Sequence, residues 1–485
     1  GLHAYKASNQ SVKEEMNEGR DNKYVVINLG STYLTGLVAS KTFDGLVMPI
    51  KAHYIPTGSC IRQGCIHNIE EAARLIGLLI DTLSEALPPE ETITGVYVGL
   101  ECRSMQAETF RAQMSLGPEG RVVTQDDLQT LRDEVNEAEY PGMRILAVTD
   151  PRYHADGRRE YTPRGVRCQH LEADYQLILV RQNIIANLEE TIHARLGLKI
   201  LGIIPTPIAE AGATLTTEES ALGCAYVNIG GGTTSIAIYQ ERLLSALYIL
   251  PLGGINVTRD LTHLNNRLME SDAEVLKVRY GSMNTSVSRG EQIQLTSTSG
   301  QETKTFVQHD VNRYINARIR EILKNVLSII AEAGFEDAVP KGLIFAGGVT
   351  HTRYFYETLH KLHFEYREGS LRRDVYDDRV APELAAQYSS VIALASRATE
   401  PGVTFEVRPL ESILQETEHV EPTPSPSTRL EAELDYTFED HDEPSPREVE
   451  PTPLRPSKTS RSRSGGWVGE VIHKFSNLFD TDEED

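Results

Sequence analysis

Two segments about 200 residues apart repeat the same pattern, a hairpin closed by a glycine-rich turn. The first is YVVINLGSTYLTGLVAS, from Tyr24 to Ser40, and the second is AYVNIGGGTTSIAIY, from Ala225 to Tyr239. In each, an apolar run leads into Gly, Ser and Thr residues and then into a second β-rich run, which is a hairpin signal. A third apolar run, GLIFAGGVTH (342–351), ends in paired glycines.

The glycine-rich turns have the composition of a phosphate-binding loop. Such a turn points several backbone N–H groups into one concavity, and glycine lets the backbone approach an anion closely. Hydroxyl groups that can donate to phosphate oxygens lie at Ser31, Thr32, Thr233 and Thr234. A single turn of this kind is about as often a hairpin that binds nothing. Two of them, with the later Gly347 and Gly348, favour a ligand held between two equivalent domains.

Segments with helical periodicity lie between these strands. Apolar residues return every three to four positions in NIEEAARLIGLLIDTLSEAL (68–87) and in VNRYINARIREILKNVLSIIAEAG (311–334). Hairpins combined with helices predict α/β layers. A chain of 485 residues is long enough for about two to four domains.

Composition argues against several classes of protein. The net charge of −22 provides no basic field, so we expect no nucleic-acid partner. The five cysteines are scattered without a CxxC pair, which indicates a reducing compartment and neither a zinc site nor a disulfide framework. Residues 1–22 are polar and contain no signal peptide. No apolar run reaches the roughly 18 residues that a membrane span needs.

The amino-acid composition changes in the C-terminal part of the chain. Between Glu411 and Leu454 the chain has 13 acidic residues against two arginines, with many prolines, which predicts a disordered linker. A short basic patch, RPSKTSRSRSGG, precedes the final WVGEVIHKFSNLFDTDEED.

On a helix, one apolar face of this last segment would contain Trp467, Val471, Phe475 and Leu478, widened by Val468, Ile472 and Phe479. An apolar face beyond a long linker favours a membrane-surface helix or a docking helix. Packing back on the globular part is the alternative.

Several stretches resemble the FtsA family, bacterial actin-like proteins of cell division. They are SCIRQGCIHNIEEAARLI, VYVGLECRSMQ, LGCAYVNIGGGTTSIAIY, ILPLGGINVTRDL, SDAEVLKVRYGS and GGWVGEVIHKFSNLF. The resemblance covers about 23–400 and 465–480. It implies an α/β, actin-like two-domain fold with an FtsA-type inserted subdomain, a disordered acidic linker and a C-terminal amphipathic helix.

The resemblance also implies a division of the chain into subdomains. Residues 1–22 would be a polar extension, and the first domain would comprise subdomain 1A (23–98 and 181–220) and the inserted subdomain 1C (99–180). The second domain would comprise subdomain 2A (221–258 and 339–407) and subdomain 2B (259–338). The linker would be 408–464, and 465–485 would be the membrane-targeting helix with an acidic tip.

The family's nucleotide site can be transferred to matching positions. The resemblance implies that the phosphates face Gly30, Ser31, Thr32, Gly230, Gly231, Gly232, Thr233 and Thr234. Glu274 and Lys277 would contact ribose and base, although without the family motif an ordinary surface ion pair would be the more frequent explanation of this spacing. Gly254, Gly347 and Gly348 would let the backbone pass close to the nucleotide. The implied cofactor is ATP, with any Mg²⁺ held more weakly than in the family.

Five positions depart from the family's pattern. Asn28 and Asn228 stand where the family has Asp, and Tyr33 stands in place of a lysine. Ser235 and Thr206 stand where the family has Asp and Glu. Carboxylates at such positions attract hydrated Mg²⁺ and help to orient the attacking water. We therefore expect a nucleotide cradle with weak or absent hydrolysis.

The implied partners are those of a division-site tether. The acidic C-terminal peptide of FtsZ would bind subdomain 2B, with Arg318 and Arg320 as candidate contacts, although both could be solvated helix charges. The inserted subdomain would contact the next subunit of a filament. The protein would lie on the cytoplasmic face of the membrane at the septum and recruit later division proteins. An actin-fold kinase or ATPase and an actin-like pilus-assembly adaptor are the alternatives.

Overall fold

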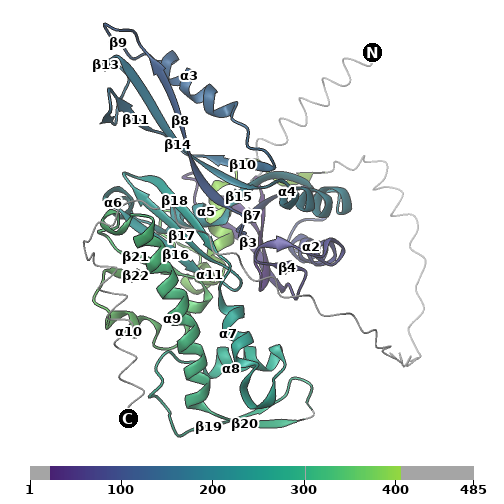
Figure 1. Ribbon diagram of the computed structural model, residues 1–485. Coiled ribbons are helices and arrows are strands. Elements are labelled where there is room, and N and C mark those ends of the chain that lie inside the picture. The colour runs from purple at the N-terminus through teal and green to yellow at the C-terminus, as the bar shows by residue number, and fades with distance from the viewer. Residues whose placement is uncertain (1–21, 301, 406–485) are drawn as a thin grey trace, which may run out of the picture. The chain divides into compact units, whose positions relative to one another are not determined.

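The computed structural model, which describes residues 22–300 and 302–405, contains two sheets built on one plan (Figure 1). The strand order is β15-β7-β1-β2-β3 in the first sheet and β18-β17-β16-β21-β22 in the second. In both, a strand that pairs antiparallel on one side pairs parallel on the other: β1 with β2 and β7, and β16 with β17 and β21. The two predicted hairpins are confirmed, and they occupy equivalent places in the two sheets.

The strands of the first sheet are β1 (Tyr24–Leu29), β2 (Tyr33–Lys41), β3 (Val47–Pro56), β7 (Gly95–Leu100) and β15 (Lys199–Pro205). Those of the second are β16 (Cys224–Ile229), β17 (Thr234–Gln240), β18 (Leu243–Leu250), β21 (Leu343–Ala346) and β22 (Tyr366–Glu368).

Helices cover both faces of the first sheet. Val25 and Ile27 of β1 pack in one core with helix α2 (Ile69–Ser84), whereas Val26 packs in another with helix α12 (Ser389–Arg397). This alternation follows from the two-residue period of a strand. The Asn68 side chain caps α2 by accepting a hydrogen bond from the Glu71 amide. A strand buried on both faces reads as a nearly continuous apolar run, as β1 does.

The second sheet packs against the long helix α9 (Gln308–Glu332). Val227 and Ile229 of β16 share a core with Ile319 and Leu323 of this helix. Helices α7 (Gly254–Leu261) and α8 (Glu270–Tyr280) lie beside α9, and the hairpin of β19 (Gln292–Thr296) and β20 (Thr303–Val307) precedes it. The helical pattern predicted for 311–334 is confirmed by α9.

Helix α5 (Thr206–Thr214) contacts both sheets. Ala209 and Ala213 pack in a core of the first sheet, and Ala211 shares a core with Tyr226 of β16. Pro207 stands in the first helical turn, where its missing N–H is tolerated. Small side chains let the helix lie close to its neighbours, so α5 can direct side chains to the place where the two hairpin turns meet.

The chain between β7 and β15 forms a sheet of its own. Its long strand β14 (His170–Arg181) pairs with β8 (Gln106–Ser115), β10 (Met143–Val148) and β11 (Arg152–Ala155), and β11 also pairs with β12 (Arg158–Glu160). Helix α3 (Gln125–Asn136) packs on this sheet through Leu131 and Val135. The segment is the expected inserted subdomain, and its limits of 99 and 180 remain a prediction.

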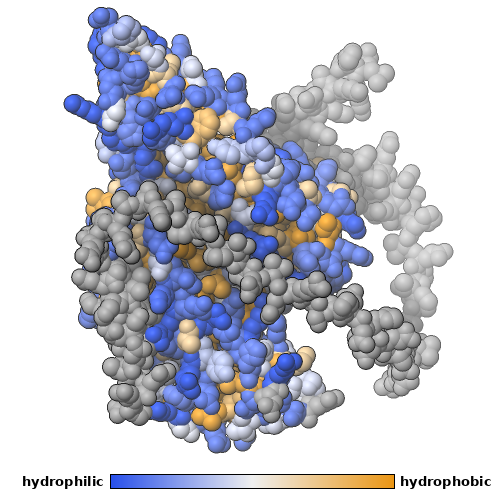
Figure 2. All heavy atoms as spheres, viewed as in Figure 1, coloured by the Kyte–Doolittle hydropathy of each residue, from blue (hydrophilic) through white to orange (hydrophobic). Residues whose placement is uncertain are grey.

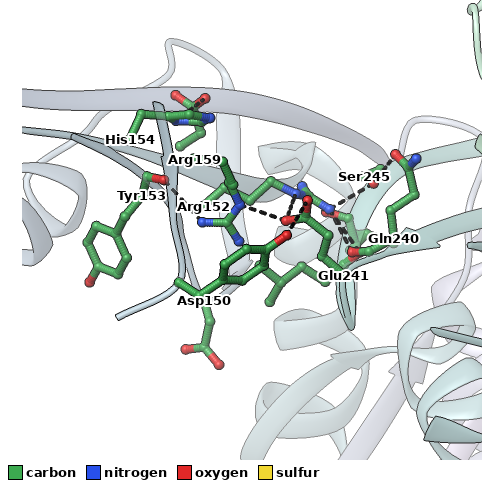
Figure 3. Close-up of polar contacts among 12 residues, drawn as sticks. Asp150, Arg152, Tyr153, His154, Arg159, Gln240, Glu241 and Ser245 are labelled. Carbon is green, nitrogen blue, oxygen red and sulfur yellow. Dashed lines mark hydrogen bonds and ion pairs between the residues drawn. The ribbon is translucent and has the colours of Figure 1, made fainter. Parts of the chain in front are cut away.

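An arginine clasp joins the inserted subdomain to the turn between β17 and β18 (Figure 3). The Arg152 guanidinium donates to the carbonyls of Gln240, Leu243 and Leu244 and, at 2.8 Å, to Ser245 Oγ. Arg159 Nε donates to Glu241 Oε2 at 2.6 Å. Glu241 and Arg242 have φ of +53° and +65°, the conformation of a two-residue hairpin turn that glycine or asparagine usually occupies. The clasp holds this turn, and β17 links it to the glycine-rich turn at the strand's other end.

Shorter elements complete the described part: β4 (Ile61–Arg62), β5 (Cys65–Ile66), β6 (Glu91–Ile93), β9 (Arg121–Val122), β13 (Arg167–Cys168), α4 (Gln182–Leu188), η1 (Glu189–Arg195), α6 (Thr217–Leu222), η2 (Leu264–Asn266), η3 (Glu336–Ala338), η4 (Gly348–His351), α10 (Phe355–His360), α11 (Pro382–Gln387) and β23 (Val403–Phe405). In the view of Figure 2, hydrophilic residues cover most of the described surface. No helix among the described residues is long and apolar enough to cross a membrane. All five cysteines lie in the described residues and are free.

Candidate functional site

The two glycine-rich turns lie against each other. A Cβ atom added to Gly231 would lie 1.9 Å from Thr32 Oγ1, and one added to Gly232 would lie 2.4 Å from Ser31 Oγ. Only glycine permits this approach. The amides of Gly231 and Gly232 donate none of the hydrogen bonds found within residues 22–300 and 302–405, so they are available to an anion.

Two neighbouring cavities open beside the paired turns. We name them after the groups that the family resemblance implies there. The larger, the nucleoside cavity, encloses about 380 Å³, and the smaller, the phosphate cavity, about 190 Å³. Gly230, Gly231 and Gly348 line both. A volume of a few hundred Å³ suits a small-molecule ligand. The predicted residues Gly30, Ser31, Gly232, Thr233 and Gly347 line the phosphate cavity, and Thr32, Gly254, Glu274 and Lys277 line the nucleoside cavity.

Helix α8 supplies the polar groups of the nucleoside cavity. Lys277 Nζ donates to Glu274 Oε2 at 2.6 Å and to Thr258 Oγ1 at 2.8 Å. The same Glu274 oxygen accepts from Thr258 Oγ1 at 2.5 Å. Glu274 and Lys277 therefore do form an ion pair, and that pair is part of the cavity wall. Arg353, which sequence reasoning missed, also lines the cavity and donates to the Tyr280 carbonyl at 2.7 Å.

Three predicted residues of the site have a structural role of their own. Thr234 is fully buried, lines neither cavity, and donates from Oγ1 to the Leu252 carbonyl at 2.8 Å. Gly347 has φ of +97°, and a Cβ there would lie 2.3 Å from the Ile229 carbonyl oxygen, so this position requires glycine. Ser31 Oγ accepts from the Gly64 amide at 3.0 Å, which fixes the first turn.

The asparagines that replace the family's acids are held by hydrogen bonds. Asn28 Oδ1 accepts from Thr206 Oγ1 at 2.9 Å, and Asn228 Nδ2 donates to Glu210 Oε2 at 2.6 Å. Ser235, the cross-strand partner of Asn228, is fully buried, and its hydroxyl has no hydrogen-bond partner among the described residues. Tyr33 stands at the mouth of the nucleoside cavity, with its ring edge-on to that of Tyr54.

Two carboxyl groups that the sequence did not reveal line the phosphate cavity: Glu101 and Glu210. Glu101 Oε1 accepts from Thr233 Oγ1 at 2.7 Å, and Glu210 Oε1 accepts from Ser390 Oγ at 2.5 Å. Burial raises the pKa of Glu101 to about 8, and repulsion from Glu210 adds to the shift. Burial also raises the pKa of Glu210.

Both carboxyl groups had a signal in the sequence. Glu101 directly follows β7, and the carboxyl ends of parallel strands are the usual place for ligand contacts in open α/β sheets. Glu210 lies four residues after Thr206, hence on the same face of α5. Neither lies in a glycine-rich segment, so the glycine-rich pattern does not point to them.

Arg318 lies on α9 and is engaged within the chain. Its guanidinium donates to Asp260 at 2.6 and 3.0 Å and to Glu321 at 2.6 Å. The hydrogen bond to Asp260 raises the pKa of Arg318 above the usual value of an arginine. Arg320 is half-buried on the same helix. The predicted membrane-facing residues, from Trp467 to Phe479, lie outside the described residues.

The two equivalent sheets, the facing turns and the cavities between them define a protein of the actin-like class. A solved structure described as a PilM-PilN type IV pilus biogenesis complex matches with a TM-score of 0.52 and 16% identity, over 78% of this chain and 97% of that one, which supports the fold alone. The model of the family described as "Cell division protein FtsA" matches residues 225–423.

Proteins related in sequence narrow the assignment from the actin-like class to one family. A cell division protein FtsA of Porphyromonas gingivalis is 38% identical over 406 residues, covering 84% of each chain. One of Bacillus subtilis is 27% identical over 333 residues, covering 67% of this chain and 73% of that protein. The chain belongs to the FtsA family of cell-division proteins.

Proposed function

We propose that this protein is a nucleotide-binding adaptor that attaches FtsZ filaments to the inner face of the cytoplasmic membrane at the division septum. It assembles into actin-like filaments and helps to recruit later division proteins. Family membership supports the role in division. The single observation that carries nucleotide binding is the pair of facing turns, whose glycines meet Thr32 and Ser31 beside the two cavities.

The two alternative functions have less support. The similarity to a pilus-assembly complex, at 16% identity, supports a shared fold only. The 38% identity to an FtsA supports a role in cell division. An actin-fold kinase or an active ATPase would need a free carboxylate to activate the attacking group. Thr206 and Asn28 are instead hydrogen-bonded to each other.

Nucleotide binding has a direct test in the purified protein. We expect adenine nucleotide to remain bound through purification, or to bind on titration with a fluorescent ATP analogue. Mass spectrometry of the released ligand identifies it. A protein that retains none, and that gives no titration signal with or without Mg²⁺, would contradict the nucleotide part of the proposal.

We expect ATP hydrolysis near background. The position of the family's water-orienting Glu is Thr206, whose hydroxyl is committed to Asn28, and Glu210 accepts from Asn228 and Ser390. Glu101, the other carboxyl group of the cavity, accepts from Thr233, and its pKa of about 8 keeps it mostly protonated at neutral pH. No ionised, unengaged carboxylate is then left to orient the attacking water. Phosphate release should match that of the pocket variant Gly231→Asp. Mg²⁺-dependent release well above that variant would refute this expectation.

The acidic C-terminal peptide of FtsZ is expected to bind the lobe that contains α9. Arg318→Glu should weaken binding at least about tenfold, because a charge-assisted hydrogen bond contributes roughly 1.5–3 kcal/mol. Fluorescence anisotropy with a labelled peptide measures this.

Two control variants make the peptide test specific. Asp260→Asn loosens the internal pair of Arg318 while keeping the arginine's charge, so it should bind the peptide at least as well as wild type. Arg158→Glu reverses an exposed charge on β12 of the inserted subdomain and should leave binding unchanged. Equal losses in Arg318→Glu and Arg158→Glu would refute the placement of the peptide.

A further inference from the structure

Two cysteine side chains meet beside the phosphate cavity. Cys65 lies on β5, in the short hairpin with β4, and Cys102 follows β7. Their thiols are hydrogen-bond partners. The backbones around them are also in contact, because a Cβ atom added to Gly64 would lie 1.5 Å from the Glu101 carbonyl oxygen and 3.2 Å from Cys102 Cα. Both thiols are free, so the structure shows the reduced form of this thiol pair.

The residues that precede the two cysteines, Gly64 and Glu101, support the two glycine-rich turns. The Gly64 amide donates to Ser31 Oγ of the first turn at 3.0 Å. Glu101 Oε1 accepts from Thr233 Oγ1 of the second turn at 2.7 Å. Gly64 and Glu101 also line the phosphate cavity. A bond between the two sulfurs would therefore act on the supports of both turns at once.

The thiol pair differs in reactivity from the other cysteines. The hydrogen bond from Cys65 lowers the pKa of Cys102 to about 7, so the pair carries a thiolate at neutral pH. Cys65 is only partly buried, which gives a small oxidant access to the pair. Burial raises the pKa of the remaining thiols, Cys60, Cys168 and Cys224, and keeps them protonated. Oxidation should therefore be selective for the thiol pair.

We propose that Cys65 and Cys102 form a reversible disulfide in the presence of a hydroperoxide, and that this disulfide lowers the affinity of the two turns for nucleotide phosphates. The effect on affinity rests on the proposed nucleotide binding. In a reducing compartment such a bond is transient, as it is in redox-sensing proteins.

The reaction consumes one molecule of hydroperoxide. Proton transfer along the hydrogen bond places the negative charge on the accessible Cys65 sulfur, which attacks the terminal peroxide oxygen. The S–O bond of a sulfenic acid forms, the O–O bond breaks, and the leaving oxygen takes the Cys102 proton. The Cys102 thiolate then attacks the Cys65 sulfur, so the S–S bond forms and the S–O bond breaks. The departing hydroxide takes a solvent proton, and two electrons have passed from sulfur to oxygen.

Closing the disulfide should move the supports of the turns. Two hydrogen-bonded sulfurs are farther apart than the about 2.05 Å of an S–S bond, so they must approach each other. The backbones of Gly64 and Glu101 already touch, so the approach cannot be absorbed between them. It shifts the contact with Ser31 or with Thr233 instead. ATP affinity should fall at least about tenfold, as for the loss of one charge-assisted hydrogen bond to phosphate.

The first measurement counts free thiols in the purified full chain. After treatment with hydrogen peroxide and then catalase, N-ethylmaleimide labels the thiols that remain free. Mass spectrometry should find two of the five cysteines unlabelled. Peptide mapping should place the bond between Cys65 and Cys102, and dithiothreitol should restore all five thiols. A bond between other cysteines, or five thiols that stay free, would overturn the inference.

Two variants test whether the thiol pair is the cause. Cys65→Ser keeps a hydroxyl group that can donate to Cys102, so it should bind ATP as reduced wild type does, with and without peroxide. Cys168→Ala is the matched control, because it removes a buried cysteine of the inserted subdomain that lines neither cavity. It should still form the disulfide and lose ATP affinity on oxidation. An equal loss of affinity on oxidation in Cys65→Ser would refute the role of the pair.

Titration with a fluorescent ATP analogue separates this inference from the proposed function. Oxidised wild type should bind more weakly than reduced wild type, and dithiothreitol should restore the affinity. By linkage, saturating ATP should shift the pair toward its thiols in a glutathione redox buffer. Reduced wild type that binds no ATP would overturn the proposed nucleotide binding, and the effect of the disulfide with it. Reduced and oxidised forms that bind ATP equally well would overturn this inference alone.

Discussion

Replacing Gly231 by alanine should reduce ATP affinity at least about a hundredfold. The new methyl group would lie 1.9 Å from Thr32 Oγ1 and 3.1 Å from Thr32 Cβ, so the two turns must separate. Overpacking of this kind costs roughly 1–3 kcal/mol. Displacing the amides of one turn also loses charge-assisted hydrogen bonds of roughly 1.5–3 kcal/mol each. Together these exceed the about 2.7 kcal/mol that corresponds to a hundredfold change.

Two further variants check the cause. Thr32→Ala removes the nearest clashing atom, so adding it to Gly231→Ala should recover part of the lost affinity. Gly290→Ala is the matched control, because a Cβ at Gly290 meets no atom within 4 Å. Titration with a fluorescent ATP analogue measures all of them. Wild-type affinity in Gly231→Ala would show that the turns do not enclose the phosphates together.

The sequence predicted the parts of the fold that depend on local pattern. Both glycine-rich hairpins, the strand that leads to Gly347, and helices α2 and α9 were predicted from periods of two and 3.6 residues. The actin-like α/β class followed from the family resemblance and agrees with the two equivalent sheets. Element ends were less certain: the pattern of α9 suggested 311–334, and the helix begins earlier, at Gln308.

The candidate site was predicted only where its residues belong to a motif. Most predicted glycines and hydroxyl groups do line the cavities, but Thr234 turns its hydroxyl to Leu252 because the strand alternates its faces there. Glu101 and Glu210 come from a strand end and a helix, and only the fold brings them to the turns. Whether the Arg318 side chain is paired within the chain also depends on the tertiary structure, because its partner Asp260 lies 58 residues away in the sequence. Contacts between residues so far apart in the chain cannot be inferred from the local pattern of a single sequence.

Deleting residues 465–485 should abolish sedimentation with liposomes while leaving the globular fold unchanged. The reason is the apolar area that the sequence predicts for one helical face. Burying Trp467, Phe475 and Phe479 with the neighbouring aliphatic residues offers several kcal/mol at about 25 cal/mol per Å². Ordering a short helix that is marginal alone offsets part of this. One copy should bind weakly, and a filament that presents many copies should bind tightly through avidity.

A spectroscopic signal accompanies the sedimentation. Trp467 is the only tryptophan of the chain, so its emission should shift to the blue when vesicles are added. Trp467→Asp with Phe475→Asp should remove both the shift and the sedimentation. His473→Asp with Asn477→Asp is the matched control, because it places two acids on the predicted polar face and should largely keep both signals. The control also shows how much of the lost binding results from repulsion between the added acids and anionic lipid.

The two measurements also separate the membrane from the alternative docking site for this segment. Sedimentation of the Trp467→Asp, Phe475→Asp variant at the wild-type level would mean that another surface binds the lipid. Emission that is already blue without vesicles would mean that the apolar face is buried against protein. In that case ATP or the FtsZ peptide should be tested for releasing it, since a face docked on the globular part is free for lipid only after that contact opens.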